Sequence, residues 1–404
     1  MKSRLPVVFI FITLVLDAMG IGLIIPVMPD LLDELSDGGI SDAAFWGGWL
    51  AFTYAVMQFL FGPTLGNLSD RYGRRPVLLI SMVVMGLDYL LLAVAPTLWL
   101  LFVARIINGI TGATQATANA YMADISKPED RAANFGLLGA GFGSGFILGP
   151  ACGGLLGESG PRAPVFGAAG LARANAVLGA IVLKETLPPE RRRPFRLREG
   201  NPAAAILRLR AVPQIGGLIA VVFAYQLASN VYPVIWAFFT TAKLGWSPGL
   251  IGQSLAAFGV CVAVVQGGLI RLFIDRFGPE PTVQIGLMLN LVALVSIAFV
   301  PSTMLLFMLL PICALGIIVT PAAQGIMSAA LSADRQGELQ GVWASSDGAA
   351  RIVSPPLLPG LFALFTAPGL PYLPGAPFLA AALLTVVSLV LFLRWRAGMA
   401  APAE

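Results

Sequence analysis

The sequence contains no histidine and little charge of either sign. Asp, Glu, Lys and Arg make up 11% of its 404 residues, whereas about a quarter of a typical soluble protein is charged. The absence of histidine excludes Ser-His-Asp catalysis, imidazole zinc ligands and a histidine proton switch. Cysteine is also scarce, and Cys152, Cys261 and Cys313 lie far apart in apolar segments. We interpret them as packing residues, and no redox compartment can be inferred from them.

The sequence is rich in long runs of apolar residues. Hydrophobic residues make up 57% of the chain, and the mean hydropathy is +0.84. Runs of about 20 apolar residues can each cross a hydrocarbon core of about 30 Å, so we expect an all-α integral membrane protein with twelve transmembrane helices. The predicted spans are 6–29, 43–65, 76–95, 98–122, 133–157, 163–183, 213–240, 248–270, 281–300, 303–330, 337–365 and 372–394.

The positions of Lys and Arg predict the orientation. Twenty of the 25 basic residues lie at the termini or in loops on the same side as the termini, and only Arg162 and Lys243 lie in loops on the other side. By the positive-inside rule, both termini are cytoplasmic. We therefore expect a multi-pass protein of the cell inner (plasma) membrane.

A polar, basic stretch rich in proline divides the spans into two sets of six. We expect 1–184 to form an N-terminal six-helix bundle, 185–212 a cytoplasmic linker and 213–404 a C-terminal six-helix bundle. Two interpretations of the linker stay open, because it either lies on the anionic inner leaflet or is a solvated tether.

Two loop sequences repeat at nearly one spacing. "DRYG" at 70–73 follows span 2 and recurs as "DRFG" at 275–278 after span 8, an offset of 205 residues. Asp130-Arg131 precedes span 5, and Asp334-Arg335 precedes span 11, an offset of 204. The halves are therefore predicted to be pseudo-symmetric copies, as in transporters whose two halves rock about a midplane site.

Several segments carry a family resemblance. "GNLSDRYGRRP" (66–76) resembles the loop 2–3 signature of the major facilitator superfamily, and "RIINGITGA" (105–113) resembles its span 4 motif. "GFILGPACGG" (145–154) resembles the span 5 motif of the antiporters of that family. "LDAMGIGLIIPVMP" (16–29) and "YAVMQFLFGP" (54–63) are similar to the tetracycline-resistance branch of drug–proton antiporters.

The resemblance implies proton-coupled efflux of small amphipathic compounds by alternating access, with tetracycline-like drugs as the leading substrates. A transporter of this kind is not an enzyme. Two alternatives stay open: the same fold exporting a different metabolite or drug, and a non-transporting membrane receptor or scaffold. Members of this branch usually carry a histidine in span 8 and an aspartate in span 9, where this chain has Val262 and Asn290. The identity of the substrate is therefore left open.

The expected partners are a small-molecule substrate, protons and membrane lipids. We expect no nucleic acid partner and a monomeric protein. No cofactor is expected, because the proton gradient would supply the energy. The sequence leaves open whether a divalent metal travels with the substrate as a chelate.

Charges inside the spans are the first candidates for function, since a charge at mid-bilayer costs at least about 2.5–3.5 kcal/mol. Asp88 and Arg105 both lie about 12 Å below the turn that joins spans 3 and 4, so an ion pair is expected. Asp17 lies near mid-membrane with no cation close in sequence, and desolvation favours the neutral form of such an acid. With the resemblance, this assigns Asp17, Asp88 and Arg105 to proton coupling.

Other polar groups complete a candidate substrate cavity, although each is also compatible with an ordinary interhelical hydrogen bond. They are Tyr54, Gln58, Gln115, Asn119, Gln226, Asn230, Asp347 and Arg351. Asp347 and Arg351 are four residues apart on one helical face, and they either line the cavity or form a buried pair. Arg173 has no partner in its own span, and Asp347 is one candidate.

The charged loop 2–3 predicts a reversible latch on the cytoplasmic side. Asp70 can accept hydrogen bonds from a helix N-terminus or pair with Arg71, Arg74 or Arg131. The second copy lacks the paired arginines after its glycine, so it should latch more weakly. The alternative is that the arginines only anchor the topology. The predicted gate comprises Asp70, Arg71, Arg74, Arg75, Arg131, Asp275 and Arg276.

Span 5 is unusually rich in glycine. Small residues allow close helix approach, and proline lets a helix bend. We expect a packing seam that opens and closes, with ordinary close packing without motion as the alternative. Its residues are Gly145, Gly149, Pro150, Gly153 and Gly154.

Overall fold

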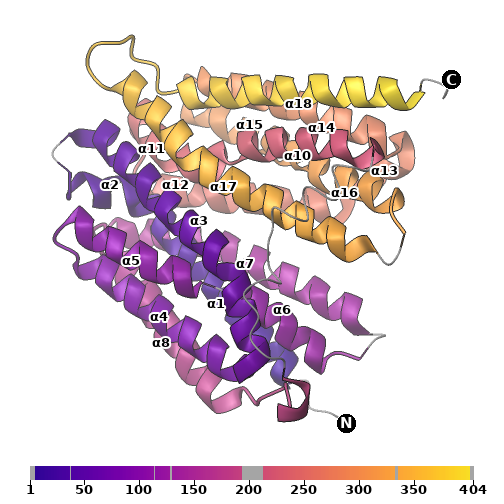
Figure 1. The fold of residues 1–404 in the computed structure, drawn as a ribbon. Coiled ribbons are helices and arrows are strands. Elements are labelled where there is room, and N and C mark those ends of the chain that lie inside the picture. Colours follow the sequence, from indigo (N-terminus) through magenta and orange to yellow (C-terminus); the bar gives the residue numbers. More distant parts are fainter. Residues whose placement is uncertain are drawn as a thin grey trace. The chain divides into compact units, whose positions relative to one another are not determined.

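The computed structural model describes residues 5–36, 38–112, 114–127, 130–192, 213–332 and 335–400. Within these residues the regular elements are all helices (Figure 1). Eleven helical segments there are long and apolar enough to cross a membrane, and Leu98–Thr111 is a shorter apolar helix. The predicted all-α, twelve-span membrane architecture is confirmed.

Contacts divide the chain into two compact units. Unit 1 comprises Met1–Gly200 together with Trp246–Ala256, and unit 2 comprises Asn201–Gly245 and Ala257–Glu404. Most of the predicted linker, 193–212, lies outside the described residues, and its visible start contains the short helix η3 (Pro189–Arg191). The domain boundaries from the sequence stay predictions.

Unit 1 contains the helices of the first six spans and the start of a later helix. The elements are α1 (Leu5–Ile24), η1 (Ile25–Val27), α2 (Met28–Asp33), α3 (Gly39–Tyr72), α4 (Arg74–Val94), α5 (Leu98–Thr111), α6 (Thr114–Ile125), α7 (Arg131–Gly157), α8 (Ala163–Val182) and the first residues of α12 (Pro248–Val264). Helix α4 packs between α5 and α8, and α3 packs against α5 (Figure 1).

The fourth predicted span, 98–122, is interrupted. Helix α5 ends at Thr111 and α6 begins at Thr114, with Gly112 at φ −74° and ψ 44° between them. The Gly112 carbonyl accepts a hydrogen bond from the side chain of Gln58 on α3 at 3.3 Å. The described part of span 4 therefore consists of two shorter helices, and a side chain of α3 binds the carbonyl at the end of the first.

Glycines on α7 allow it to pack backbone to backbone on α1. A Cβ atom added to Gly145 or Gly149 would collide with the main-chain oxygen of Val15 or Met19, one turn apart on α1. Gly153 repeats this contact one turn further along. The close packing expected for span 5 is thus present, and any side chain on it would push the two helices apart. Opening and closing of the seam stays a prediction.

The same seam continues onto the start of α12 within unit 1. A Cβ atom at Gly154 would meet the Pro248 carbonyl and the Cα atoms of Gly249 and Gly252. A Cβ atom at Gly252 would in turn meet the main-chain oxygen of Pro150. The end of α7 therefore faces glycines of α12, and each backbone lies against the other.

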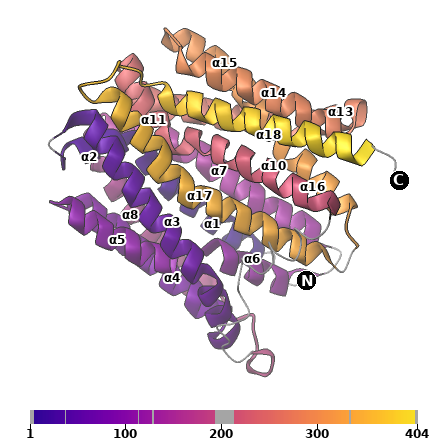
Figure 2. The ribbon, with the colours of Figure 1, turned by 45° about the horizontal axis from the view of Figure 1, so that its top comes forward.

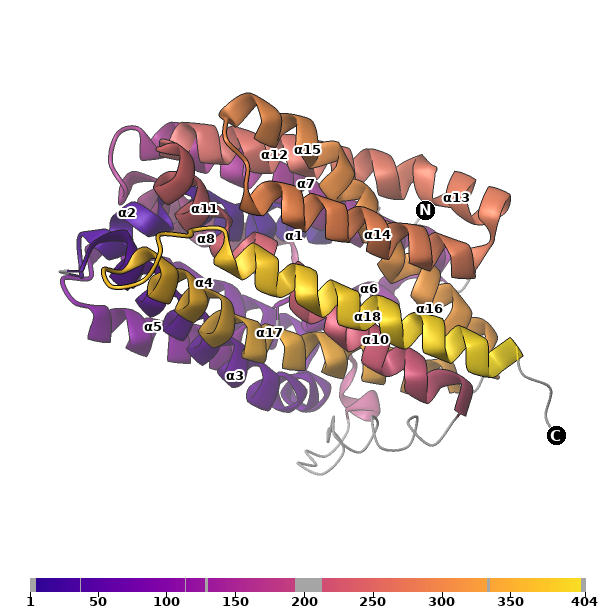
Figure 3. The same ribbon diagram turned by 90° about the horizontal axis from the view of Figure 1, so that it is seen from above.

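Unit 2 contains the remaining spans, several of them divided into consecutive shorter helical elements. The elements are α10 (Pro213–Ser229), α11 (Val231–Leu244), the rest of α12, the π-helical turn η5 (Val265–Leu269), α13 (Ile270–Phe277), α14 (Pro279–Ala298), α15 (Thr303–Leu315), η6 (Gly316–Ile318), α16 (Val319–Ala329), α17 (Gln336–Thr366) and α18 (Ala376–Ala400). Helix α18 lies beside α10 and α14 (Figures 2 and 3), around buried side chains such as Val221, Leu287 and Phe392.

Candidate functional site

A cavity of about 320 Å³ lies inside unit 1, between α1, α3, α4, α5 and α7. Most of its wall is apolar, from side chains such as Leu14, Ile21, Met85 and Phe142. Its polar lining residues are Asp17, Tyr54, Gln58, Tyr89, Arg105 and Asn108. An apolar wall with a few polar groups is suited to a small amphipathic molecule.

Asp88 and Arg105 lie together at one side of the cavity. Arg105 Nη1 is 3.8 Å from Asp88 Oδ2, and the Asp88 side chain is completely buried. The amide of Asn108, on α5, donates a shorter hydrogen bond of 2.6 Å to the same oxygen. The ion pair expected from equal depth on adjacent helices is confirmed, and Asn108 adds a neutral donor that the sequence analysis missed.

Asp17 is also buried, but its surroundings differ. Its Oδ1 accepts a hydrogen bond of 3.2 Å from the amide of Asn175 on α8. Among the described residues Asp17 forms no ion pair, in agreement with the absence of a cation near it in sequence. Asp17 and Arg105 both line the cavity, whereas Asp88 reaches the cavity only through Arg105 and Asn108.

Tyr54 and Gln58 line the same cavity from α3. The amide of Gln58 donates to the Tyr54 hydroxyl at 2.9 Å and to the Gly112 carbonyl at 3.3 Å. The pair expected to share one face of span 2 is therefore joined to the break in span 4. Of the polar pair predicted on that span, the Gln115 side chain lies outside the described part, and Asn119 is half-buried on α6 away from this cavity.

The cavity residues predicted in the second half have different surroundings in unit 2. Gln226 accepts a hydrogen bond of 2.9 Å from the buried Ser346, which is the interhelical alternative. Asn230 lies at the break between α10 and α11. Asp347 and Arg351 form an ion pair of 2.7 Å, but their side chains are 37% and 60% exposed. Of the two alternatives left open for this pair, burial is therefore wrong, and a place on the cavity wall stays a prediction.

Arg173 is exposed on α8, and it forms no ion pair with any residue in the described part of the chain. A Cβ atom at Gly86 on α4 would meet its aliphatic stem. Asp347, the candidate partner from the sequence, pairs with Arg351 instead.

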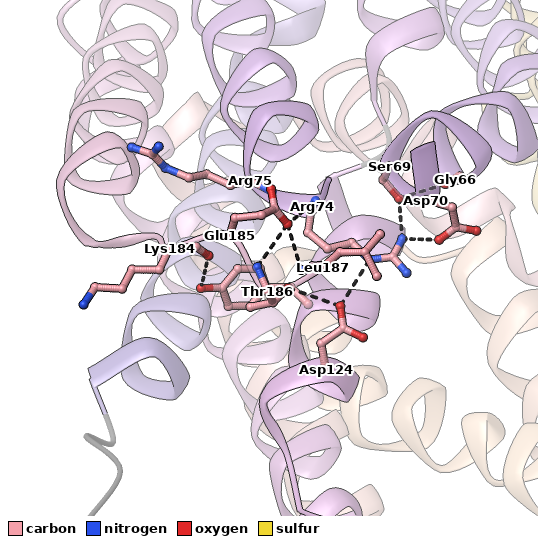
Figure 4. Close-up of polar contacts among 11 residues, drawn as sticks. Gly66, Ser69, Asp70, Arg74, Arg75, Asp124, Lys184, Glu185, Thr186 and Leu187 are labelled. Atoms are coloured by element: carbon pink, nitrogen blue, oxygen red, sulfur yellow. Dashed lines mark hydrogen bonds and ion pairs between the residues drawn. The ribbon is translucent and has the colours of Figure 1, made fainter. Parts of the chain in front are cut away.

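A second polar cluster surrounds the loop between α3 and α4 (Figure 4). Arg74 binds Asp70 Oδ1 and the Ser69 hydroxyl, each at 2.6 Å, and it reaches Asp124 at the end of α6 at 3.3 Å. Its side chain is only 13% exposed. The pairing of Asp70 with Arg74 is confirmed, and Asp124 is a further acid that was not predicted to lie here.

The N-terminus of α4 is bound by a residue that no sequence pattern gave a reason to select. Glu185, just after α8, accepts hydrogen bonds from the main-chain N–H groups of Arg74 at 2.9 Å and Arg75 at 3.2 Å (Figure 4). The expectation that Asp70 accepts from a helix N-terminus is therefore not met at α4. Gly73 has φ +106°, and a Cβ atom there would collide with the Glu185 carboxylate.

The other arginines of this loop do not pair with Asp70. The Arg71 guanidinium lies 5.2 Å from the ring centroid of Tyr72, and Arg75 donates to the carbonyl of Ala180 at 2.9 Å. The side chain of Arg131 lies outside the described part.

The second copy of the loop is more open. Asp275 pairs with Arg271 at 3.7 Å, with 69% and 87% of the two side chains exposed. The Arg276 guanidinium lies 5.8 Å from the ring centroid of Phe277. This agrees with the expectation that the second copy holds its loop less firmly.

At the other end of unit 1, Glu158 follows α7 and accepts a hydrogen bond of 2.9 Å from the Gly249 N–H at the start of α12. The Ser247 hydroxyl and this N–H together hold the pKa of Glu158 below its ordinary value of 4.5. The carboxylate thus binds the N-terminus of α12 where the α7 glycines contact it.

Sequence comparison decides the family. The model of the Major Facilitator Superfamily matches residues 10–316 and 217–403. The chain is 40% identical to tetracycline resistance protein class C of Escherichia coli over 90% of its own length and 91% of the relative. It is 37% identical to the class B protein of Escherichia coli, over 84% of each chain. The chain belongs to the major facilitator superfamily. Within that superfamily it belongs to the tetracycline-resistance branch.

The superfamily fold is also found by structural comparison. A bacterial homologue of the human lysosomal transporter Spinster, solved in an inward-facing, unoccupied conformation, superimposes with a TM-score of 0.78 and 16% identity, covering the whole of both chains. Membership of this superfamily makes the protein a transporter and not an enzyme.

Asn290 stands where this branch of the superfamily usually has an aspartate, and it is a neutral, buried residue in the structure. Its amide donates to the Thr385 hydroxyl at 3.2 Å, and its carbonyl accepts from the Tyr232 hydroxyl at 3.4 Å. Val262, at the position of the usual histidine, lies on α12 and packs against the cluster around Ile318.

Proposed function

We propose that the protein exports tetracycline-like drugs from the cell in exchange for protons, by alternating access. The observation that carries the proposal is Asp17, a buried acid that forms no ion pair among the described residues and lines an apolar cavity. A carboxyl group in that setting can bind a proton or release it, depending on which side the cavity faces. The names and high identity of the tetracycline resistance relatives support the choice of substrate.

In this mechanism Asp17 carries the proton, and the ion pair of Asp88 and Arg105 supplies charged groups beside the same cavity. Tyr54 and Gln58 supply hydrogen-bonding groups to the substrate from α3. The proton and the drug compete for binding, because both bind to polar groups in the wall of the same small cavity. Each half-cycle therefore carries one of the two across the membrane.

The cluster around Arg74 is the proposed cytoplasmic latch. It joins α3, α4, α6 and the segment after α8 through Asp70, Asp124 and Glu185. In this proposal the protein lies in the inner membrane, in contact with lipids, and both termini are cytoplasmic. It works as a monomer. No resident cofactor takes part, and a divalent metal enters only if the drug carries it as a chelate.

A second candidate function is export of a different amphipathic compound by the same fold. Val262 and Asn290 favour it, because neither side chain can titrate where the branch usually has a histidine and an aspartate. A growth-inhibition panel against an empty-vector control separates the two. Unchanged tetracycline sensitivity would favour the second.

Uptake of fluorescent tetracycline into inverted vesicles tests the proposal directly. We expect uptake when the vesicle interior is acidic, and we expect it to collapse when the proton gradient is dissipated. Vesicles from the empty vector serve as the control. Uptake that is the same with and without the gradient would contradict proton coupling.

A further inference from the structure

Among the described residues of unit 1, two acids are buried, and each accepts a hydrogen bond from an asparagine on a neighbouring helix. Asn108 donates to Asp88, which also has Arg105. Asn175 donates to Asp17, which has no cation beside it in the described structure. The two acids differ in their number of partners. Among the described residues, Asp88 has both the amide of Asn108 and the guanidinium of Arg105, whereas Asp17 has only the amide of Asn175.

The amide of Asn175 is itself held in one orientation by Thr13, one turn before Asp17 on α1. Its Oδ1 accepts from the Thr13 hydroxyl at 3.2 Å, and its Nδ2 lies 3.5 Å from the Thr13 carbonyl and 3.2 Å from Asp17 Oδ1. A main-chain carbonyl and a carboxylate only accept, so the NH₂ group must face them. Thr13 and Asn175 have no exposed surface.

We propose that Asn175 is a positioning residue for the proton carrier Asp17. It binds one carboxyl oxygen from the α8 side and leaves the other oxygen to the cavity, where the proton and the substrate compete. A neutral donor can bind the charged carboxylate and the carbonyl oxygen of the protonated form alike. An arginine in its place would hold the acid ionised. This inference rests on the proposed proton-coupled transport.

The most direct probe is Asn175→Leu, which keeps the shape of the side chain and removes the amide. Thr13→Val is the matched control, because it removes the hydroxyl that orients the amide but leaves the amide donor in place. Two transport readouts are compared in vesicles: substrate uptake driven by a proton gradient, and energy-independent substrate counterflow. Membrane insertion at the wild-type level is checked for each variant.

We expect Asn175→Leu to lower proton-driven uptake by about tenfold, the worth of one hydrogen bond to a charged group, with counterflow within about twofold of wild type. Thr13→Val should show a smaller loss. Equal losses in both readouts would mean that Asn175 only supports the packing of α8. Unchanged proton-driven uptake would also overturn the inference.

Infrared spectroscopy of the purified protein separates this inference from the proposed function, since it needs no substrate. The carboxyl band that disappears in Asp17→Asn identifies Asp17, and Asn175→Leu should shift this band because its carbonyl loses a hydrogen bond. An unmoved band would contradict the positioning role. If wild-type vesicles show no proton-driven uptake while the band still shifts, the proposed function fails and the positioning role stands.

Discussion

The buried polar groups of the two units are of different kinds. In unit 1, Asp17 and Arg105 line one cavity, and the buried Asp88 pairs with Arg105 behind it. In unit 2, the buried Asn290 is bound by Tyr232 and Thr385 through neutral hydrogen bonds. Neutral groups need only a partner to be tolerated inside the bilayer, whereas charges remain expensive even when paired. The charged side chains of unit 1 therefore indicate a functional role, because burying them costs free energy. The neutral hydrogen bonds around Asn290 in unit 2 are explained by packing.

The two copies of the charged loop differ in the same way. The Arg74 side chain is nearly buried and joins three side chains, whereas the Arg271–Asp275 pair is largely exposed. A repeated sequence therefore does not imply an equally strong interaction. What differs is the set of neighbours: Asp124 and Glu185 lie beside the first copy.

Breaking the ion pair of unit 1 should have the largest effect on stability. Arg105→Leu leaves the carboxylate of Asp88 buried without a cation, and we expect the free energy of unfolding to fall by about 3 kcal/mol. In unit 2, Asn290→Leu removes only neutral hydrogen bonds and should cost about 1–2 kcal/mol. Denaturant unfolding in detergent micelles measures both. The double variant Asp88→Asn, Arg105→Leu should recover part of the loss, and no recovery would contradict the pairing.

Substitutions in the two loop copies should differ next. Arg74→Ala removes contacts to Asp70, Asp124 and Ser69, and we expect a loss of about 2 kcal/mol in unfolding free energy. Arg271→Ala removes an exposed pair and should cost less than about 0.5 kcal/mol. Equal shifts in the thermal midpoints of the two variants would refute the difference between the copies.

Glu185 offers a test of the α4 N-terminus. Glu185→Ala removes the acceptor for the first N–H groups of α4, and loss of such a cap costs about 1 kcal/mol. Glu190→Ala, on the exposed turn that follows, is the matched control and should be neutral. Hydrogen exchange at the Arg74 and Arg75 amides measures the local effect. Protection that is unchanged in Glu185→Ala would count against the cap.

The smallest effect should come from Glu158. Its pKa is lowered by Ser247 and Gly249, so the charged form stabilises the folded state above the ordinary pKa of 4.5. That contribution is lost as the pH falls below 4.5 through the lower pKa of the folded state. The thermal midpoint of the wild type should therefore fall more than that of Glu158→Gln across this window. Parallel curves for the two proteins would argue against the interaction.

Much of the fold follows from the sequence because apolar length and charge placement are strong signals. The spans and the repeat follow from composition and spacing, and the glycine seam at Gly145, Gly149 and Gly153 follows from the small residues of a segment that also carries a family motif. The end of α5 at Gly112 was not predicted, and the carbonyl there is bound by Gln58 from another helix.

The site was predicted in part. Asp17, Asp88 and Arg105 stand out because charges are rare in spans, and equal depth was enough to pair the last two. Asn108 and Asn175 carry no such signal, because an asparagine in a span looks like any interhelical hydrogen bond. Glu185 lies 111 residues from Arg74, so only the packing of α8 beside α4 reveals that it binds there.

The most direct test is proton movement coupled to substrate in liposomes that contain the purified protein. With wild-type protein, an imposed tetracycline gradient should drive protons in the opposite direction, seen with a pH-sensitive dye inside the liposomes. With Asp17→Asn, the account predicts no proton flux above that of empty liposomes. Proton flux at the wild-type rate in Asp17→Asn would contradict it.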